Sequence, residues 1–157
     1  MKLKFTILLL IIIYMLTGCQ EEKASLAITM NGIQNVIDTE SIYNSTGSVV
    51  FPAVVRSSGE KPVETEYKGI ELSILLTQNN FEFSDYDKII INATDGYRII
   101  LNTEELKEPS NVYLTFERDG EILKSKKQGG NGPFQLVIRR DPFSQRWVKH
   151  VNEIVLE

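Results

Sequence analysis

The sequence predicts an α+β fold: a single mixed domain with a mainly antiparallel sheet or a partial barrel. Short runs of alternating apolar residues, typical of half-buried strands, outnumber apolar runs with helical spacing. Two turn pairs, Asp95-Gly96 and Asp119-Gly120, stand between such runs and predict hairpins, and therefore antiparallel pairing. The chain has 157 residues, of which 42% are apolar and 24% charged, so its length and composition suit about one globular domain.

The first half of the chain contains fewer clear elements than the second. Residues 26–30 alternate as a strand, whereas residues 33–48 are polar and show no clear pattern. Residues 49–55 form a β-branched run, in which Pro52 indicates an edge strand or a break. Residues 69–79 are spaced as a short apolar helix that begins at its first glycine.

The second half alternates strands with turns. Residues 88–93 carry β-branched side chains on both faces, which indicates a central strand. Thr103 is a candidate N-cap for a short helix that ends at Leu106. Residues 147–154 are expected to form a turn or short helix that leads into a last strand. Further strands are expected at 97–101, 112–116, 121–123 and 134–138.

The N-terminus has the pattern of an export signal. Lys2 and Lys4 precede an apolar run over residues 5–16, which is shorter than the roughly 20 residues of a membrane-spanning helix. The sequence Leu16-Thr17-Gly18-Cys19 resembles the lipobox of bacterial lipoproteins, in which the Cys becomes the first mature residue and carries the lipid. An ordinary cleaved signal peptide or a plain anchor is the alternative. We therefore expect a signal peptide at 1–18, a lipidated Cys19 with a tether over 19–25, and a domain at 26–157.

The expected cellular location, the net charge and the low number of Cys and His residues limit the possible functions. Removal of Lys2 and Lys4 leaves 15 basic against 21 acidic residues, a net charge of −6. We expect a protein that is anchored to the extracytoplasmic face of the cell membrane by acyl chains such as palmitate on Cys19. An acidic protein in that place is not expected to bind nucleic acid. One Cys and one His exclude an intramolecular disulfide, a cysteine-rich zinc site and a multi-histidine metal site.

A loop rich in lysine and glycine, residues 124–132, is the first candidate ligand site. Lys126 and Lys127 supply positive charge, and Gly129 and Gly130 allow backbone N–H groups to approach an anion closely. This pattern favours a phosphate or another small anionic ligand. Since no helix start or phosphate-loop spacing accompanies it, the alternative interpretation is a solvated hairpin loop.

A second basic cluster surrounds the only tryptophan. Arg139, Arg146 and Lys149 flank Trp147, and Trp and Arg are favoured anchors of binding sites. The cluster is a candidate ligand rim, and the alternative is a core Trp whose edge is covered by arginines. His150 has no recognisable acid or nucleophile as a partner and is expected at the surface.

A series of short motifs occurs in order along the chain. They are residues 26–32, Tyr67-Lys68-Gly69-Ile70-Glu71-Leu72 with Leu75-Leu76, Ile89 through Tyr97, Asp119-Gly120-Glu121-Ile122-Leu123, Gly129-Gly130 with Phe134 through Ile138, and Trp147-Val148-Lys149 with Ile154. In order and spacing this series resembles the molybdopterin-binding domain of the sulfite oxidase family. The resemblance extends over nearly the whole mature chain, from about Leu26 to Glu157, and implies that family's fold.

The chain departs from the family at one chemical position. The family's enzymes hold molybdenum through the cofactor's dithiolene and one Cys thiolate, on a segment that matches Val49–Gly59 here. This segment reads Phe51-Pro52-Ala53-Val54-Val55-Arg56 and has no Cys, and aliphatic side chains cannot donate to a metal. The resemblance therefore supports the fold and weakens the redox activity. No cofactor or metal is expected, and molybdopterin binding is kept as an alternative.

Three functional hypotheses follow. The first is a non-catalytic ligand-binding or accessory lipoprotein on a sulfite-oxidase-like scaffold, with a small anionic ligand or a protein partner. The second is a molybdopterin-dependent oxidoreductase that holds its cofactor without a protein thiolate, with basic residues such as Lys126 and Arg139 around it. The third is a structural or partner-binding surface lipoprotein, in which an exposed strand edge near Pro52 pairs with another chain.

Overall fold

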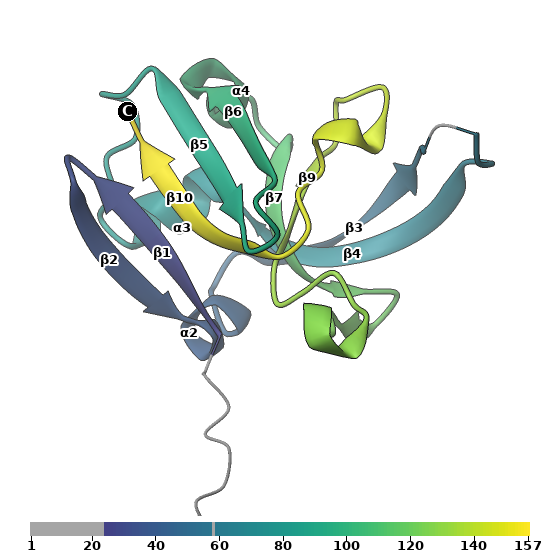
Figure 1. Ribbon diagram of the computed structural model, residues 1–157. Coiled ribbons are helices and arrows are strands. Elements are labelled where there is room, and N and C mark those ends of the chain that lie inside the picture. The colour runs from purple at the N-terminus through teal and green to yellow at the C-terminus, as the bar shows by residue number, and fades with distance from the viewer. Residues whose placement is uncertain (1–23, 58) are drawn as a thin grey trace, which may run out of the picture.

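A computed structural model describes residues 24–57 and 59–157, so the expected signal peptide and Cys19 lie outside the described residues. The first of two sheets has the strand order β2-β1-β10-β5-β6 (Figure 1). β1 and β10 are parallel, and the other neighbours are antiparallel. The strands are β1 (Ser25–Met30), β2 (Ile33–Asp38), β5 (Lys88–Ala93), β6 (Arg98–Asn102) and β10 (Val151–Leu156).

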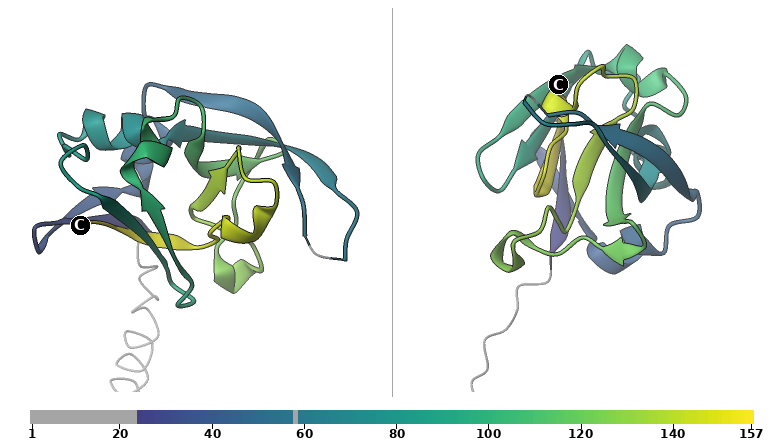
Figure 2. Two further views of the ribbon diagram at one scale, coloured as in Figure 1. Left: turned by 90° about the horizontal axis from the view of Figure 1, so that it is seen from above. Right: turned by 90° about the vertical axis from the view of Figure 1, so that its right-hand side faces the viewer.

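The second sheet has the order β3-β4-β7-β8, and β9 also pairs with β7. All of its pairs are antiparallel, and the β3–β4 hairpin projects from the body of the molecule (Figures 1 and 2). The strands are β3 (Ser48–Val55), β4 (Val63–Glu71), β7 (Val112–Arg118), β8 (Glu121–Ile122) and β9 (Gln135–Ile138). Both sheets are open in the described part of the chain. The α+β class is confirmed, and the partial-barrel alternative is wrong.

Short helices connect the strands. They are α2 (Thr39–Tyr43), α3 (Leu72–Gln78) and α4 (Thr103–Lys107), with the 3₁₀ turns η1 (Lys126–Gln128) and η2 (Ser144–Arg146). Over residues 24–57 and 59–157, none of the helices is long and apolar enough to cross a membrane. The domain is therefore mostly sheet, and its short helices lie between strands along the chain.

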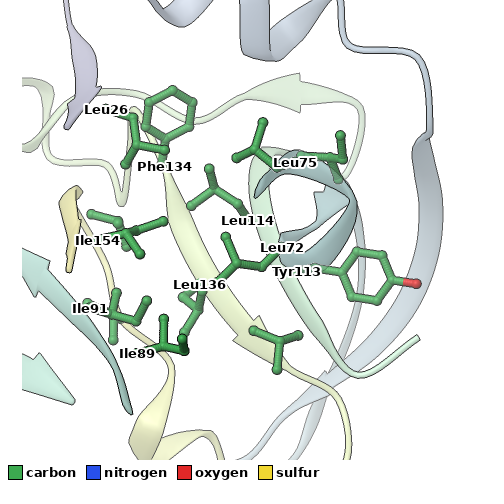
Figure 3. Close-up of a cluster of buried hydrophobic side chains, with 14 of the residues drawn as sticks. Leu26, Leu72, Leu75, Ile89, Ile91, Tyr113, Leu114, Phe134, Leu136 and Ile154 are labelled. Atoms are coloured by element: carbon green, nitrogen blue, oxygen red, sulfur yellow. The ribbon is translucent and has the colours of Figure 1, made fainter. Parts of the chain in front are cut away.

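The hydrophobic core lies between the two sheets and α3. Strand alternation turns Leu26, Ile91 and Ile154 of the first sheet inward, and they share this core with Leu114 and Leu136 of the second (Figure 3). The helix α3 adds a buried stripe of leucines to the same core, formed by Leu72, Leu75 and Leu76. The core therefore joins both sheets into one domain.

Gly69 lies within β4 and does not begin the helix, which corrects the expectation for residues 69–79. A Cβ at this position would lie 2.4 Å from the carbonyl oxygen of Leu114, because β4 and β7 approach closely at a register shift between Lys68 and Gly69. The glycine is needed for this close backbone approach. The helix α3 begins only at Leu72.

The structure also settles several smaller expectations about where elements lie and which residue caps α4. The unassigned residues 33–48 contain β2 and α2, and Pro52 lies in β3, which is an edge strand as expected. Thr103 is the first residue of α4 and not its cap. The cap is Asn102, whose side chain accepts from the Glu105 amide at 2.9 Å. The predicted strand at 88–93 is central, as β5 between β10 and β6.

Candidate anion-binding cleft

A cleft of about 430 Å³ lies between β3 and the chain that follows β9. The edge strand β3 forms one wall, because Pro52 and its neighbours leave this side of the strand without a partner strand in the described part of the chain. The other wall comes from the Arg139–Trp147 segment and the turn before β7. The lining residues are Pro52, Ala53, Val54, Arg56, Pro109, Ser110, Arg139, Arg140, Asp141 and Trp147.

Two cations of the cleft form no ion pair with a carboxylate among the described residues. Arg139 places its guanidinium 5.2 Å from the centre of the Phe51 ring, and its Nη1 donates to the Ser110 carbonyl at 3.4 Å. Neither Arg139 nor Arg56 forms an ion pair within residues 24–57 and 59–157. These two guanidinium groups therefore give the cleft an uncompensated positive charge.

The other arginines of the cluster are neutralised. Arg140 pairs with Glu108 at 2.8 Å, from Nη1 to Oε2. Arg146 donates to both Asp141 oxygens, at 2.5 and 2.9 Å, and to Glu105 at 2.8 Å. The hydrogen bonds that Arg146 donates to Asp141 and then to Glu105 raise the pKa of Arg146 further above its usual range. The carboxylate of Asp141 is thereby occupied, and it adds little repulsion against an anion in the cleft.

The backbone at Arg139 and Arg140 is held by a buried asparagine. The Arg139 amide donates to the Asn111 carbonyl at 2.9 Å, and the Arg140 amide donates to Asn111 Oδ1 at 3.2 Å. The Asn111 side chain in turn donates to the Glu105 carbonyl at 3.1 Å. These bonds fix where the two arginine side chains leave the backbone, beside the cleft.

Trp147 is both a core residue and a wall of the cleft. It is 9% exposed, its Nε1 donates to the Ile138 carbonyl at 3.0 Å, and its ring meets the Tyr67 ring edge-on at 5.9 Å. The core interpretation of Trp147 is confirmed. Because the remaining exposed part of the ring lines the cleft, it is also available to contact a ligand.

The chemistry of this wall does not fit a thiolate-held molybdenum. The β3 segment places Ala53 and Val54 at the cleft, and neither side chain has an electron pair for a metal. Among the residues that the structure describes, no group of three or more His, Cys, Asp or Glu side chains gathers into a metal site. The described lining of the cleft therefore contains three arginines and neither a thiol nor an imidazole group.

The lysine-glycine loop borders a different cleft, of about 470 Å³, with Arg118 and Lys124. Gly129 and Gly130 line it, whereas Lys126 and Lys127 are exposed and lie outside its lining. A Cβ on Gly130 would lie 2.1 Å from the Lys124 carbonyl oxygen, so close packing within the loop explains this glycine. The structure thus places Gly129 and Gly130 beside Lys124, and it leaves Lys126 and Lys127 outside the cleft.

The remaining predicted residues fall outside both linings. Lys149 is exposed and lines neither cleft, and Arg146 is connected to the first cleft only through Asp141. The expectation that His150 lies at the surface is wrong. It is 7% exposed, and its Nδ1 lies 3.1 Å from the Gly132 carbonyl oxygen, because the 129–133 loop packs over it. Its apolar neighbours Val148 and Val151 are the sequence signal that could have indicated burial.

Tyr67 is a buried polar residue that sequence reasoning missed. Its side chain is fully buried, and its hydroxyl has no hydrogen-bond partner among the described residues. Burial raises the pKa of the Tyr67 phenol, and the charge of Arg118 partly opposes this rise. The guanidinium of Arg118 lies 5.8 Å from the ring centre. Tyr67 therefore contacts one lining residue of each cleft, Trp147 of the first and Arg118 of the second.

The two open sheets with short connecting helices define a small α+β domain that is mostly sheet. The crystal structure of the sulfane dehydrogenase SoxCD from Paracoccus pantotrophus is similar, with a TM-score of 0.68 and 18% sequence identity. The match covers 88% of this chain and 39% of that chain, so this protein spans about two fifths of the length of its structural neighbour. No family model and no curated protein matches the sequence. The fold implied by the sequence motifs is supported.

Proposed function

We propose that this chain is an extracytoplasmic lipoprotein, anchored to the cell membrane through a lipid on Cys19, whose sulfite-oxidase-like domain binds a small anionic ligand without catalysis. The anchor rests on the basic N-terminus, the short apolar run and the Leu16–Cys19 motif. The binding role rests on the cleft beside β3. Under this proposal the protein is an accessory module that captures or presents its ligand at the membrane surface.

The observation that carries the binding role is the pair of uncompensated guanidinium groups of Arg56 and Arg139 in one cleft. Guanidinium groups bind oxyanions and carboxylates with charge-assisted hydrogen bonds, often in pairs. Trp147 supplies an apolar surface beside them. These features favour a compact anion, with one or two negative charges and an apolar side, as the ligand.

The proposal that the domain is non-catalytic rests on the same cleft. At the segment that the family resemblance matches to the thiolate-bearing one, the chain offers Ala53 and Val54. The sequence has a single Cys, and this residue is assigned to the lipid. A cofactor held through a protein thiolate is therefore not expected here.

Calorimetric titration of the mature chain in detergent with inorganic sulfate tests the binding role. We expect saturable binding, and Arg139→Met should weaken it about tenfold or more, because one charge-assisted hydrogen bond is worth roughly 1.5–3 kcal/mol. Methionine keeps an apolar side chain on Phe51. Arg98→Met is the matched control and should bind as the wild type does, since Arg98 is an exposed residue of β6 that is bonded to Asn92. Absence of saturable binding, or an Arg139→Met affinity equal to that of the wild type, contradicts the proposal.

A further inference from the structure

The strand β2 is an edge without the protection that the other edge strands have. It forms one border of the first sheet, and no strand within the described residues pairs with its outer side. The opposite border, β6, begins with Arg98, and β3 contains Pro52, both of which discourage pairing with another chain. The edge strand β8 has only two residues. β2 has six residues, with no Pro, Lys or Arg and no register shift against β1.

The side chains of β2 suit an interface. Ile33 and Val36 are 67% and 64% exposed, the largest exposed fractions among the large apolar residues of the described chain. The only charged residue of the strand is Asp38, at its end. Its carboxylate accepts from the Ser41 amide at 3.0 Å and caps α2, so it is already engaged. The edge therefore presents two exposed apolar side chains beside the uncharged Gln34 and Asn35, and it carries no free charge.

The hairpin geometry indicates which backbone groups are free. Asn31 and Gly32 both have positive φ, 52° and 75°, as in a two-residue hairpin turn that pairs Met30 with Ile33. Antiparallel pairing alternates along the strand, so every second residue from Ile33 bonds to β1. The N–H and C=O groups of Gln34 and Val36 consequently point to the free edge.

We propose that β2 pairs with β2 of a second copy of this chain, antiparallel about a twofold axis at Asn35. In this register Gln34 of each copy meets Val36 of the other through the free backbone groups. Ile33 of each copy lies opposite Ile37 of the other, and no two charges face each other along the paired segment. The two first sheets then form one continuous sheet of ten strands.

Charge and the position of the chain end favour a second copy as the occupant. The full chain carries a net charge of −4, so contact between two copies is least costly at an edge without free charge. The segment outside the structure joins the domain at residue 24, directly before Ser25 of β1, and Ser25 pairs with Asp38 of β2. If that segment ends at the membrane, as the proposed function has it, two copies hold their β2 edges at the same height.

Anchoring both copies to one membrane compensates for the small area that the pairing of two β2 strands buries. One strand pairing buries much less than the roughly 800 Å² per partner of a standard interface, so the dimer is expected to be weak in dilute solution. Tethering two copies to one surface raises their effective concentration and favours a weak pair. The dimer should therefore form at the membrane and dissociate readily in detergent.

Cysteine crosslinking in membranes that contain the full chain tests this register. Asn35→Cys places two equivalent residues across the axis in a non-hydrogen-bonded pair, about 4.5 Å apart at Cα, within the range that a disulfide spans. We expect a covalent dimer under a mild copper oxidant, well above the background of the unsubstituted chain, which controls for Cys19. Ile100→Cys, an exposed residue of the opposite edge strand β6, should stay at that background.

A second substitution tests whether the crosslink depends on pairing of the β2 strands. Val36→Lys, added to Asn35→Cys, places two cations at the interface and should lower the dimer yield at least severalfold, whereas Val50→Lys on β3 should not. Val36 and Val50 are both exposed, so neither change is expected to unfold the domain. Crosslinking of Asn35→Cys no stronger than that of Ile100→Cys, or unaffected by Val36→Lys, overturns the proposal. The outcome is independent of whether the cleft binds sulfate.

Discussion

Arg56 and Ser144, 88 residues apart in the sequence, exchange two hydrogen bonds. The Arg56 amide donates to Ser144 Oγ at 2.8 Å, and the Ser144 amide donates to the Arg56 carbonyl at 3.2 Å. This pair joins the end of β3 to the η2 turn and so fixes one end of the candidate cleft. The positions of Arg56 and Arg139 relative to each other therefore depend on a contact that no local sequence pattern shows.

Ser144→Ala is expected to weaken sulfate binding about threefold to tenfold, since an ordinary hydrogen bond is worth about 0.5–1.5 kcal/mol. The substitution removes the bond to the Arg56 amide and loosens the position of Arg56. Calorimetric titration measures the change. Ser84→Ala, an exposed serine whose hydroxyl bonds to no described residue, should bind as the wild type does. Equal affinities of both variants would show that the pair does not organise the cleft.

Trp147→Phe is expected to lower the free energy of unfolding by about 1–3 kcal/mol, because the buried Ile138 carbonyl loses the indole donor at 3.0 Å and keeps the longer bond from the Asp141 amide at 3.4 Å. Urea unfolding followed by far-UV circular dichroism measures this without relying on the tryptophan. Tyr97→Phe removes a comparable bond, from the Tyr97 hydroxyl to the Gln145 carbonyl, at an exposed site and should cost less. An equal or larger loss for Tyr97→Phe would contradict the buried position of Trp147.

Gly69→Ala is expected to destabilise the domain more than Gly32→Ala. The added Cβ would lie 2.4 Å from the Leu114 carbonyl oxygen and 2.7 Å from Thr115 Cα, so β4 and β7 must separate, at a cost of about 1–3 kcal/mol or more. At Gly32 nothing lies within 4 Å, and the cost is about 1–2 kcal/mol for the positive φ of 75°. Thermal unfolding of both variants decides the order, and a more stable Gly69→Ala would contradict the bulge geometry.

Asp119 is expected to contribute an acid-sensitive part of the stability. Hydrogen bonds from the Glu66 amide and then the Thr65 hydroxyl lower the pKa of its carboxyl below the ordinary value. A lowered pKa in the folded state means that this stabilisation is present above about pH 4, the usual pKa of an unfolded Asp, and is lost as the pH falls through the folded pKa.

Urea unfolding at pH 7 and at successively lower pH values measures the effect of Asp119→Asn. The variant should be less stable than the wild type at pH 7, and the difference should shrink as the acidity increases below pH 4. Asp85→Asn, an exposed aspartate without a hydrogen bond to the described residues, serves as the control. A difference that is constant with pH would contradict the role of the ionised carboxylate.

Sequence reasoning identified elements whose signal is local. The alternating runs became β1, β7 and β9, the β-branched run at 88–93 became β5, and the Asp95-Gly96 pair became the turn between β5 and β6. These signals were sufficient because side-chain period and turn residues act over a few positions. It failed at Gly69 and His150, where the deciding contacts come from Leu114 and Gly132, far along the chain. A glycine before a helix and a glycine at a bulge look the same in sequence.

The candidate site likewise combines features that the local sequence shows with features that only the fold creates. Arg139, Arg146 and Trp147 lie close together in the sequence, so a basic cluster around a tryptophan could be predicted. Phe51 belongs to β3 and Arg56 follows that strand, and both meet the cluster only through the tertiary fold. Which arginines are neutralised also depends on distant carboxylates, such as Glu105 and Glu108. The sequence alone therefore could not tell which arginines are neutralised.

Elemental analysis for molybdenum and tungsten tests the central claim most directly. The full chain with its export signal is produced in a host that makes the pterin cofactor, and the membrane-bound protein is purified. A cleft walled by Ala53 and Val54 predicts far less than one metal atom per chain. A stoichiometric content of about one molybdenum or tungsten per chain, retained through purification, would contradict a cofactor-free binding module.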